Sequence, residues 1–170
     1  LCIISMSMFC TGNPDRKTTV ASALKPDQSA SLSLGWDFTK EESITKFSNV
    51  IQKYNVFVNS AYVAPGVQEV LMNTCYSEWM RLDIKGHIIN IGTTLENTND
   101  TSDYNQSKQK LKRQSLKLNE ETGISGIKLS YIILGGIGPG QCEPDHIQQT
   151  INWIIDQPFR IPIIQLDSVK

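Results

Sequence analysis

The sequence predicts an α/β fold in which a mostly parallel β-sheet is flanked by helices on both faces. Apolar runs of strand length alternate with longer amphipathic stretches along the 170 residues, which is the pattern of successive βαβ units. Runs such as Val56-Phe57-Val58 are apolar without alternation, as expected of strands covered on both faces. Because no internal repeat or linker interrupts this order, we expect residues 1–170 to form a single domain.

The first elements are a strand, a helix and a second strand. Cys2–Cys10 is a nearly continuous apolar run, which predicts a buried strand. Pro14 suits the first position of a helix that should run to about Leu24. Residues Ser31–Trp36 are predicted to form the second strand.

Thr39 is expected to cap the next helix, with Glu42 completing a capping box. Apolar residues at helical spacing mark the buried face of that helix: Ile44, Phe47, Val50 and Ile51. The strand that follows is predicted at Asn55–Asn59.

The rest of the chain continues the alternation. A helix should begin after Pro65-Gly66 and end at Gly86. Its expected apolar stripe is Val67, Val70, Leu71, Cys75, Trp79 and Leu82. The remaining expected elements are a strand over Ile88–Thr93, a loop over Leu95–Asp103, a helix from Tyr104 to about Glu121, a strand over Ile127–Leu134, a helix over Asp145–Gln157 and a strand over Ile161–Leu166.

Composition and charge exclude several classes of function. The net charge is −1, so global electrostatics favour neither a nucleic acid nor an anionic membrane as partner. The basic stretch Lys108 to Arg113 is interpreted as a solvated helix face. No apolar run approaches the roughly 20 residues that span a bilayer.

The cysteines and histidines predict neither a disulfide framework nor a metal site. No pair of cysteines has metal-ligand spacing, and the two histidines, His87 and His146, lie far apart in the sequence. The four cysteines are Cys2, Cys10, Cys75 and Cys142. We expect buried free thiols in a reducing compartment, and hence a cytoplasmic protein.

Tyr104 and Lys108 are the strongest candidates for chemistry. On a helix they share one face, one turn apart, and an ammonium beside a phenol favours the phenolate. Such a tyrosine can donate and accept a proton near neutral pH. The hydroxyl of Thr93, at the end of the preceding strand, could point at the same place. Three such groups suit carbonyl reduction or alcohol oxidation.

The order of motifs resembles the short-chain dehydrogenase/reductase family over nearly the whole chain. The segments that carry the resemblance are Asp37-Phe38-Thr39, Val58-Asn59-Ser60-Ala61, Gly86-His87-Ile88-Ile89-Asn90-Ile91-Gly92-Thr93, the Tyr104 and Lys108 pair, and Leu134-Gly135. The resemblance implies a Rossmann-like, doubly wound sheet that binds a nicotinamide dinucleotide at its carboxyl edge. It departs from the family at Ser60 and Tyr62, and where Thr93 replaces the usual serine.

The resemblance also implies a role for each matching residue. Tyr104 would be the general acid and base, Lys108 would lower its pKa and hold the nicotinamide ribose, and Thr93 would bind the substrate oxygen, with Thr94 as a substitute. The residues implied to contact the cofactor are Asn13, Asp37, Asn59, Ala61, Lys108 and Gly135. The reaction would be NAD(P)-dependent interconversion of a carbonyl and an alcohol.

The Gly-rich turn that normally binds the pyrophosphate is not visible. One alignment makes Cys2–Cys10 the family's second strand, which places the first strand and its glycines before Leu1; the alternative takes Cys10-Thr11-Gly12 as a degraded first turn. Under the first of these alignments, the resemblance implies that Asn13 follows the strand that reads the adenosine ribose. Nearby Arg16 and Lys17 then shift the expectation slightly from NAD toward NADP.

Two further expectations concern the helices. Asn73 is a candidate for the family's asparagine on the catalytic helix, with a packing role as the alternative. The helices beginning near Gly66 and Tyr104 would pair two copies into a homodimer or homotetramer, as the resemblance implies. The rival to the enzyme is an inactive relative that keeps the fold as a binding or assembly module.

Overall fold

The computed structural model describes residues 2–4, 36–60, 64–121, 126–135 and 142–167. Within these described ranges, five parallel strands form one sheet in the order β1-β2-β3-β4-β5. The strands are β1 (Cys2–Ile4), β2 (Val56–Asn59), β3 (His87–Thr93), β4 (Lys128–Leu134) and β5 (Ile163–Leu166). The helices are α1 (Glu41–Ile51), α2 (Val67–Arg81), α3 (Asp103–Glu121) and α4 (Pro144–Asp156), with a short 3₁₀ helix, η5, at Thr94–Asn97.

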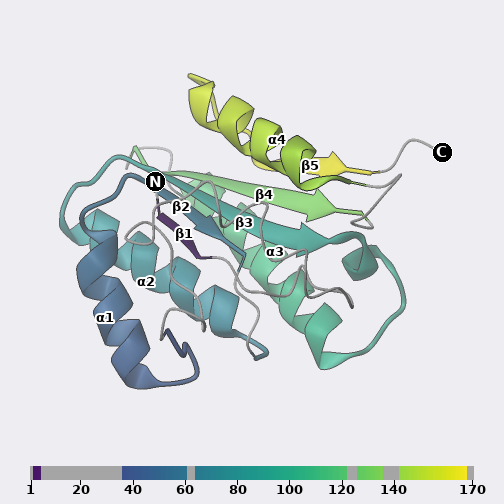
Figure 1. The fold of residues 1–170 in the computed structure, drawn as a ribbon, viewed down its shortest axis with the longest axis horizontal. Helices are drawn as coiled ribbons and strands as arrows, with labels where there is room; N and C mark the ends of the chain where they lie inside the picture. Colours follow the sequence, from purple (N-terminus) through teal and green to yellow (C-terminus); the bar gives the residue numbers. More distant parts are fainter. Residues whose placement is uncertain (1, 5–35, 61–63, 122–125, 136–141, 168–170) are drawn as a thin grey trace.

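The helices cover both faces of the sheet. Helices α1, α2 and α3 lie on one face and α4 lies on the other (Figure 1). Each face has its own apolar core, one around Trp79 and Tyr131 and the other around Ile89 and Ile151. Strand β3 is buried along almost its whole length because both faces are covered. The predicted fold class is therefore confirmed.

Strand β1 lies beside β2, with Ile4 opposite Asn59. Of the predicted strand Cys2–Cys10, the structure describes Cys2–Ile4 only. Both alignments of this strand with the family stay predictions. The helix predicted from Pro14 and the strand residues 31–35 lie outside the described residues.

Helix α1 begins differently from the prediction. Its N-cap is Lys40, which makes no side-chain capping bond. The hydroxyl of Thr39 instead donates to Oδ1 of Asp37 at 2.6 Å, and the Thr39 N–H donates to the same oxygen at 3.2 Å. The predicted capping box at Thr39 is wrong, because the Thr39 hydroxyl hydrogen-bonds to the Asp37 carboxylate instead of capping α1. The buried face is as expected, since Phe47 and Ile51 are buried.

Helix α2 ends at Arg81 rather than at Gly86. Gly86 serves packing instead, because a Cβ at this position would lie 2.5 Å from the Trp79 ring and 2.7 Å from the Asn55 carbonyl oxygen. Two members of the expected stripe, Val70 and Leu82, are 46% and 40% exposed. The predicted apolar stripe therefore includes more residues than the buried face of α2 does.

The later elements lie within two residues of their predicted bounds. The expected loop after β3 contains η5, and the Ile161–Leu166 strand begins at Ile163. No helix among the described residues is long and apolar enough to cross a membrane. Cys75 and Cys142 are both buried, as expected of the cysteines.

Candidate functional site

Two of the predicted site residues, Asn59 and Thr93, are the last residues of β2 and β3. The parallel register aligns these strands, with Asn59 opposite Asn90 and Thr93 opposite Leu134. Their carboxyl ends therefore share one edge of the sheet, which is where open α/β sheets bind ligands. Helix α3 packs against β3 and β4 and brings Tyr104 and Lys108 to this region.

Lys108 is a buried cation, with 4% of its surface exposed. Its Nζ donates to Oε1 of Gln68 at 2.5 Å and to the carbonyl oxygen of Ile91 at 2.8 Å. Burial lowers the pKa of Lys108 from 10.5 to about 8, and the negative charge of Glu96 opposes that shift. The basic stretch of α3 is thus not simply a solvated face, because Lys108 points inward while Lys110 is exposed.

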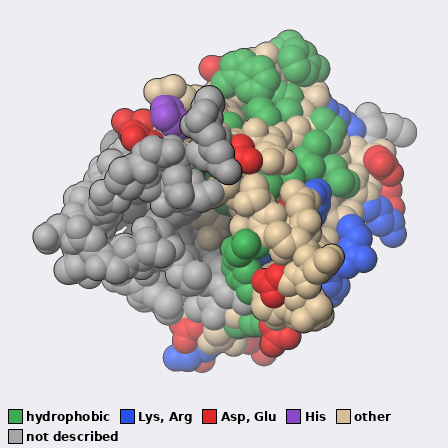
Figure 2. All heavy atoms as spheres, turned by 90° about the vertical axis from the view of Figure 1, so that its right-hand side faces the viewer, with side chains coloured by type: hydrophobic (Ala, Val, Ile, Leu, Met, Phe, Trp, Pro, Cys, Tyr) green, Lys and Arg blue, Asp and Glu red, His purple; other side chains and the backbone are tan. Residues whose placement is uncertain are grey.

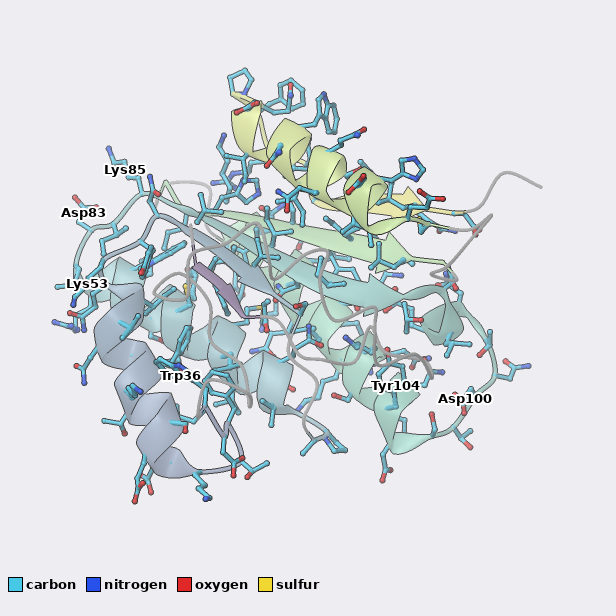
Figure 3. All side chains as sticks on the ribbon, in the orientation of Figure 1. Trp36, Lys53, Asp83, Lys85, Asp100 and Tyr104 are labelled. Carbon is cyan, nitrogen blue, oxygen red and sulfur yellow. The ribbon has the colours of Figure 1, made fainter. Side chains whose placement is uncertain are left out.

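Tyr104 lies on the first turn of α3 and is half-buried (Figure 3). The Nζ atom of Lys108 is 5.6 Å from the centroid of its ring, within the range of a cation–π contact. The start of this helix is held by local hydrogen bonds. Ser102 Oγ accepts from the Asn105 N–H at 3.2 Å, and Asp100 accepts from the Ser102 N–H at 2.9 Å. These bonds fix the turn that carries the phenol.

Thr93 is the last residue of β3 and is partly exposed. Its Oγ1 accepts a hydrogen bond from the N–H of Leu95 at 3.3 Å and so starts η5. A hydroxyl has two lone pairs and one proton. Because this bond uses a lone pair of the Thr93 oxygen, the hydroxyl proton of Thr93 can still donate to another acceptor.

Asn59 and Gln68 join the elements around Lys108. The Asn59 side chain is fully buried, and its Nδ2 donates to Oδ1 of Asn90 and to the backbone oxygen of Gln68, both at 2.8 Å. Gln68 Nε2 in turn donates to the carbonyl oxygens of Asn59 at 2.7 Å and Ile91 at 3.1 Å. This network fixes β2, α2 and β3 beneath Lys108. The cofactor contact expected of Asn59 stays a prediction.

The other predicted cofactor residues are more dispersed. The side chain of Asp37 is 33% exposed, and hydrogen bonds from Thr39 hold the pKa of its carboxyl below the usual value. Gly135 follows β4, and its N–H donates to the Leu166 carbonyl oxygen at 2.8 Å. A Cβ at Gly135 would lie 2.6 Å from Asp167 Oδ1. Asn13 and Ala61 lie outside the described residues.

Asn73 serves helix packing in the structure. Its Oδ1 accepts from Nε2 of Gln114 at 2.8 Å, which ties α2 to α3. The α2 side chain that reaches Lys108 is Gln68, which sequence reasoning missed. In the sequence, Gln68 is only a polar residue two positions after Gly66, at the start of a predicted helix. A glutamine at such a position predicts no particular contact.

Solved structures of short-chain dehydrogenases/reductases have the same fold. A metagenomic short-chain oxidoreductase in complex with NADP matches with a TM-score of 0.64 and 19% identity, over 84% of this chain and 74% of its own. Serine dehydrogenase from Escherichia coli matches with a TM-score of 0.64 and 16% identity, over 82% and 75%. A 4-hydroxyisoleucine dehydrogenase complexed with NADH and succinate matches with a TM-score of 0.62 and 17% identity, over 81% and 80%.

No protein-family model and no curated protein matches the sequence. At these low identities, the likeness to solved structures establishes the fold: the chain has the Rossmann-like architecture of short-chain dehydrogenases/reductases.

Proposed function

We propose that this protein is an NAD(P)-dependent oxidoreductase that interconverts a carbonyl and an alcohol. The observation that carries the proposal is the buried ammonium of Lys108, fixed 5.6 Å from the Tyr104 ring at the carboxyl edge of the sheet. Burying a lysine is unfavourable, and strongly perturbed groups gather at functional sites. The neighbouring folds, several solved with NADP or NAD, support a nicotinamide cofactor.

The residues present suit such a cofactor. Lys108 offers a cationic donor for the hydroxyls of a ribose. The Asp37 carboxylate, kept ionised by Thr39, offers an acceptor for an adenine amino group. When bound, the nicotinamide would supply or take the hydride, and the protein would supply position and electrostatics. Arg16 and Lys17 make NADP the slightly preferred form.

Each residue at the site has a distinct task in the proposed reaction. Tyr104 would give its proton to the carbonyl oxygen during reduction and take it back during oxidation. The positive charge of Lys108 would favour the phenolate form of Tyr104. The Thr93 hydroxyl would hold the same substrate oxygen, and Gln68 would keep the Lys108 ammonium in place.

The test is turnover by the wild type and by Tyr104→Phe. A panel of aldehydes, ketones and secondary alcohols is mixed with each nucleotide, and the absorbance of reduced nicotinamide is followed. The wild type should turn over at least one compound, and Tyr104→Phe should lose that activity while its circular dichroism is unchanged. Activity that survives in Tyr104→Phe would remove the proton-transfer role of this residue.

We also propose that copies of the chain pair through α2 and α3. Val70 and Met80 on α2 are 46% and 47% exposed, which supports an interface on that helix. A second group of apolar side chains lies where α4 and β5 lie, away from the proposed interface, as Figure 2 shows. Its exposed members include Trp153 and Ile163. Sedimentation equilibrium of the wild type and of Val70→Glu checks the pairing. If the protein pairs but binds no nucleotide, the assembly-module alternative is favoured.

A further inference from the structure

Glu96 is a buried carboxylate next to the proposed site, with 1% of its side chain exposed. It is the third residue of η5, the short helix that begins directly after Thr93. The Tyr131 hydroxyl of β4 donates to its Oε2 at 2.7 Å, and Lys112 Nζ of α3 lies 3.1 Å from its Oε1. Gln109 of α3 also donates to the Glu96 backbone oxygen, at 3.0 Å. One residue therefore joins η5, α3 and β4.

Strand β3 makes room for this arrangement. A Cβ at Gly92 would overlap the ring and hydroxyl of Tyr131. Without a side chain there, the Tyr131 ring reaches past β3 to Glu96. The Tyr131 hydroxyl also lies 3.2 Å from the carbonyl oxygen of Lys108, so the phenol touches both Glu96 and the backbone that carries the proposed catalytic lysine.

The charges around Lys108 are unevenly distributed. Among the described residues, the titratable groups near it are Tyr104 and Lys112 on its own helix, Glu96 from η5 and Tyr131 from β4. Helix α2 contributes the neutral Gln68, and β3 contributes a carbonyl oxygen. Burial and the Glu96 charge raise the pKa of Tyr131, so its phenol stays neutral and donates. Glu96 is therefore the anion of this cluster, and its charge opposes the lowering of the Lys108 pKa by burial.

We propose that Glu96 is a positioning residue of the site: its carboxylate, fixed by Tyr131 and Lys112, keeps the Lys108 ammonium charged. This inference deepens the proposed function and rests on it for its catalytic meaning. Burial alone drives Lys108 toward the neutral amine, which could not favour the Tyr104 phenolate. The buried negative charge of Glu96 favours the charged ammonium instead. This electrostatic attraction is stronger at the low dielectric constant of the protein interior.

The experiment measures the ionisation of Lys108 directly. Lysine labelled with ¹³C is incorporated, the Lys108 signal is assigned by its loss in Lys108→Met, and its Cε shift is titrated. Glu96→Gln keeps the shape of the side chain and removes its charge. The midpoint for Lys108 should fall by about one pH unit or more. Glu69→Gln is the matched control, because Glu69 pairs with the exposed Lys110 of the same helix; it should leave the midpoint unchanged.

A midpoint for Lys108 in Glu96→Gln that equals that of the wild type would overturn the proposal, even if the variant is less stable. If Glu96→Gln fails to fold, the double variant Glu96→Gln/Lys112→Met removes both charges of the pair and provides the test. Its Lys108 midpoint should lie below that of Lys112→Met alone, because the two proteins differ only in the Glu96 charge. Equal midpoints in these two proteins would overturn the proposal.

Failure of this inference can be told apart from failure of the proposed function. The lysine titration needs neither cofactor nor substrate. Fluorescence of reduced nicotinamide nucleotide, recorded against pH on the same samples, reports binding. A shifted Lys108 midpoint without nucleotide binding would support the role of Glu96 and refute the proposed function. Nucleotide binding with an unshifted Lys108 midpoint would support the proposed function and refute the role of Glu96.

Discussion

Lys108 should make the protein less stable at neutral pH than at alkaline pH. In the unfolded chain this lysine has the usual pKa of 10.5, and in the folded protein burial lowers its pKa to about 8. Below pH 8 both states carry the proton, and the folded state bears the unfavourable buried charge. As the pH rises through 8, the folded state releases its proton before the unfolded state does, so the free energy of unfolding increases toward pH 10.5.

The size of the effect follows from the shift. A difference of one pKa unit corresponds to about 1.4 kcal/mol. For a pKa lowered from 10.5 to about 8, the free energy of unfolding should rise by about 2.5 kcal/mol between pH 7 and pH 10. Lys108 is almost fully buried, so solvent screening removes little of this contribution.

Urea unfolding at a series of pH values from 7 to 10 measures the effect. Lys108→Met removes the titrating group, so the wild type should gain stability over this range relative to the variant. Other titrating groups, including Tyr131, are common to both proteins and cancel in the difference. Lys110→Met, at an exposed position on the same helix, should follow the wild type. Parallel pH profiles for the wild type and Lys108→Met would refute the argument for a buried cation.

Three further outcomes are expected. Tyr104→Phe should abolish turnover and leave the fluorescence of bound nucleotide unchanged, because the phenyl ring still fills the space but carries no proton. Gly92→Ala should lower the free energy of unfolding by about 1–3 kcal/mol, because its Cβ would overlap Tyr131; Gly66→Ala, in open space but at φ +84°, should cost only about 1–2 kcal/mol. Asn73→Ala should cost about 1 kcal/mol in urea unfolding through its lost bond to α3, with unchanged nucleotide affinity.

The sequence was sufficient for the parts of the fold that depend on long apolar runs. Strands β3 and β4 are buried on both faces, so their largely apolar sequences indicated both position and parallel pairing. The alternation of elements then predicted that Thr93 and Tyr104 would lie at one edge of the sheet. Caps were less predictable, because Thr39 had two possible partners and bonds to Asp37.

Helix α3 shows why side-chain burial was harder to predict. Its inward stripe is largely polar, and includes Asn105, Lys108, Ser115 and Asn119. These side chains are stabilised by partners from other elements, as when Ser115 accepts from Asn90 at 3.3 Å. Hydrophobic periodicity marks only apolar stripes, so it could not predict that this polar stripe is buried. The basic segment was therefore interpreted as solvated.

The polar network behind the site left no readable pattern in the sequence. Gln68 and Glu96 lie on different elements, and the side chain of each accepts a hydrogen bond from a residue far along the chain. Their roles depend on the distances between elements, which are set only by packing. Strand order is a similar case, since the place of β1 beside β2 follows from pairing rather than from local sequence.

Nucleotide binding is the most direct test of the proposed cofactor site. NADH and NADPH are titrated into the folded protein while the fluorescence of the reduced nicotinamide is recorded. We expect a saturable enhancement with at least one nucleotide, retained in Tyr104→Phe and strongly weakened in Lys108→Met. No enhancement with either nucleotide in the folded wild type, or equal affinity in Lys108→Met, would contradict a nicotinamide site built around Lys108.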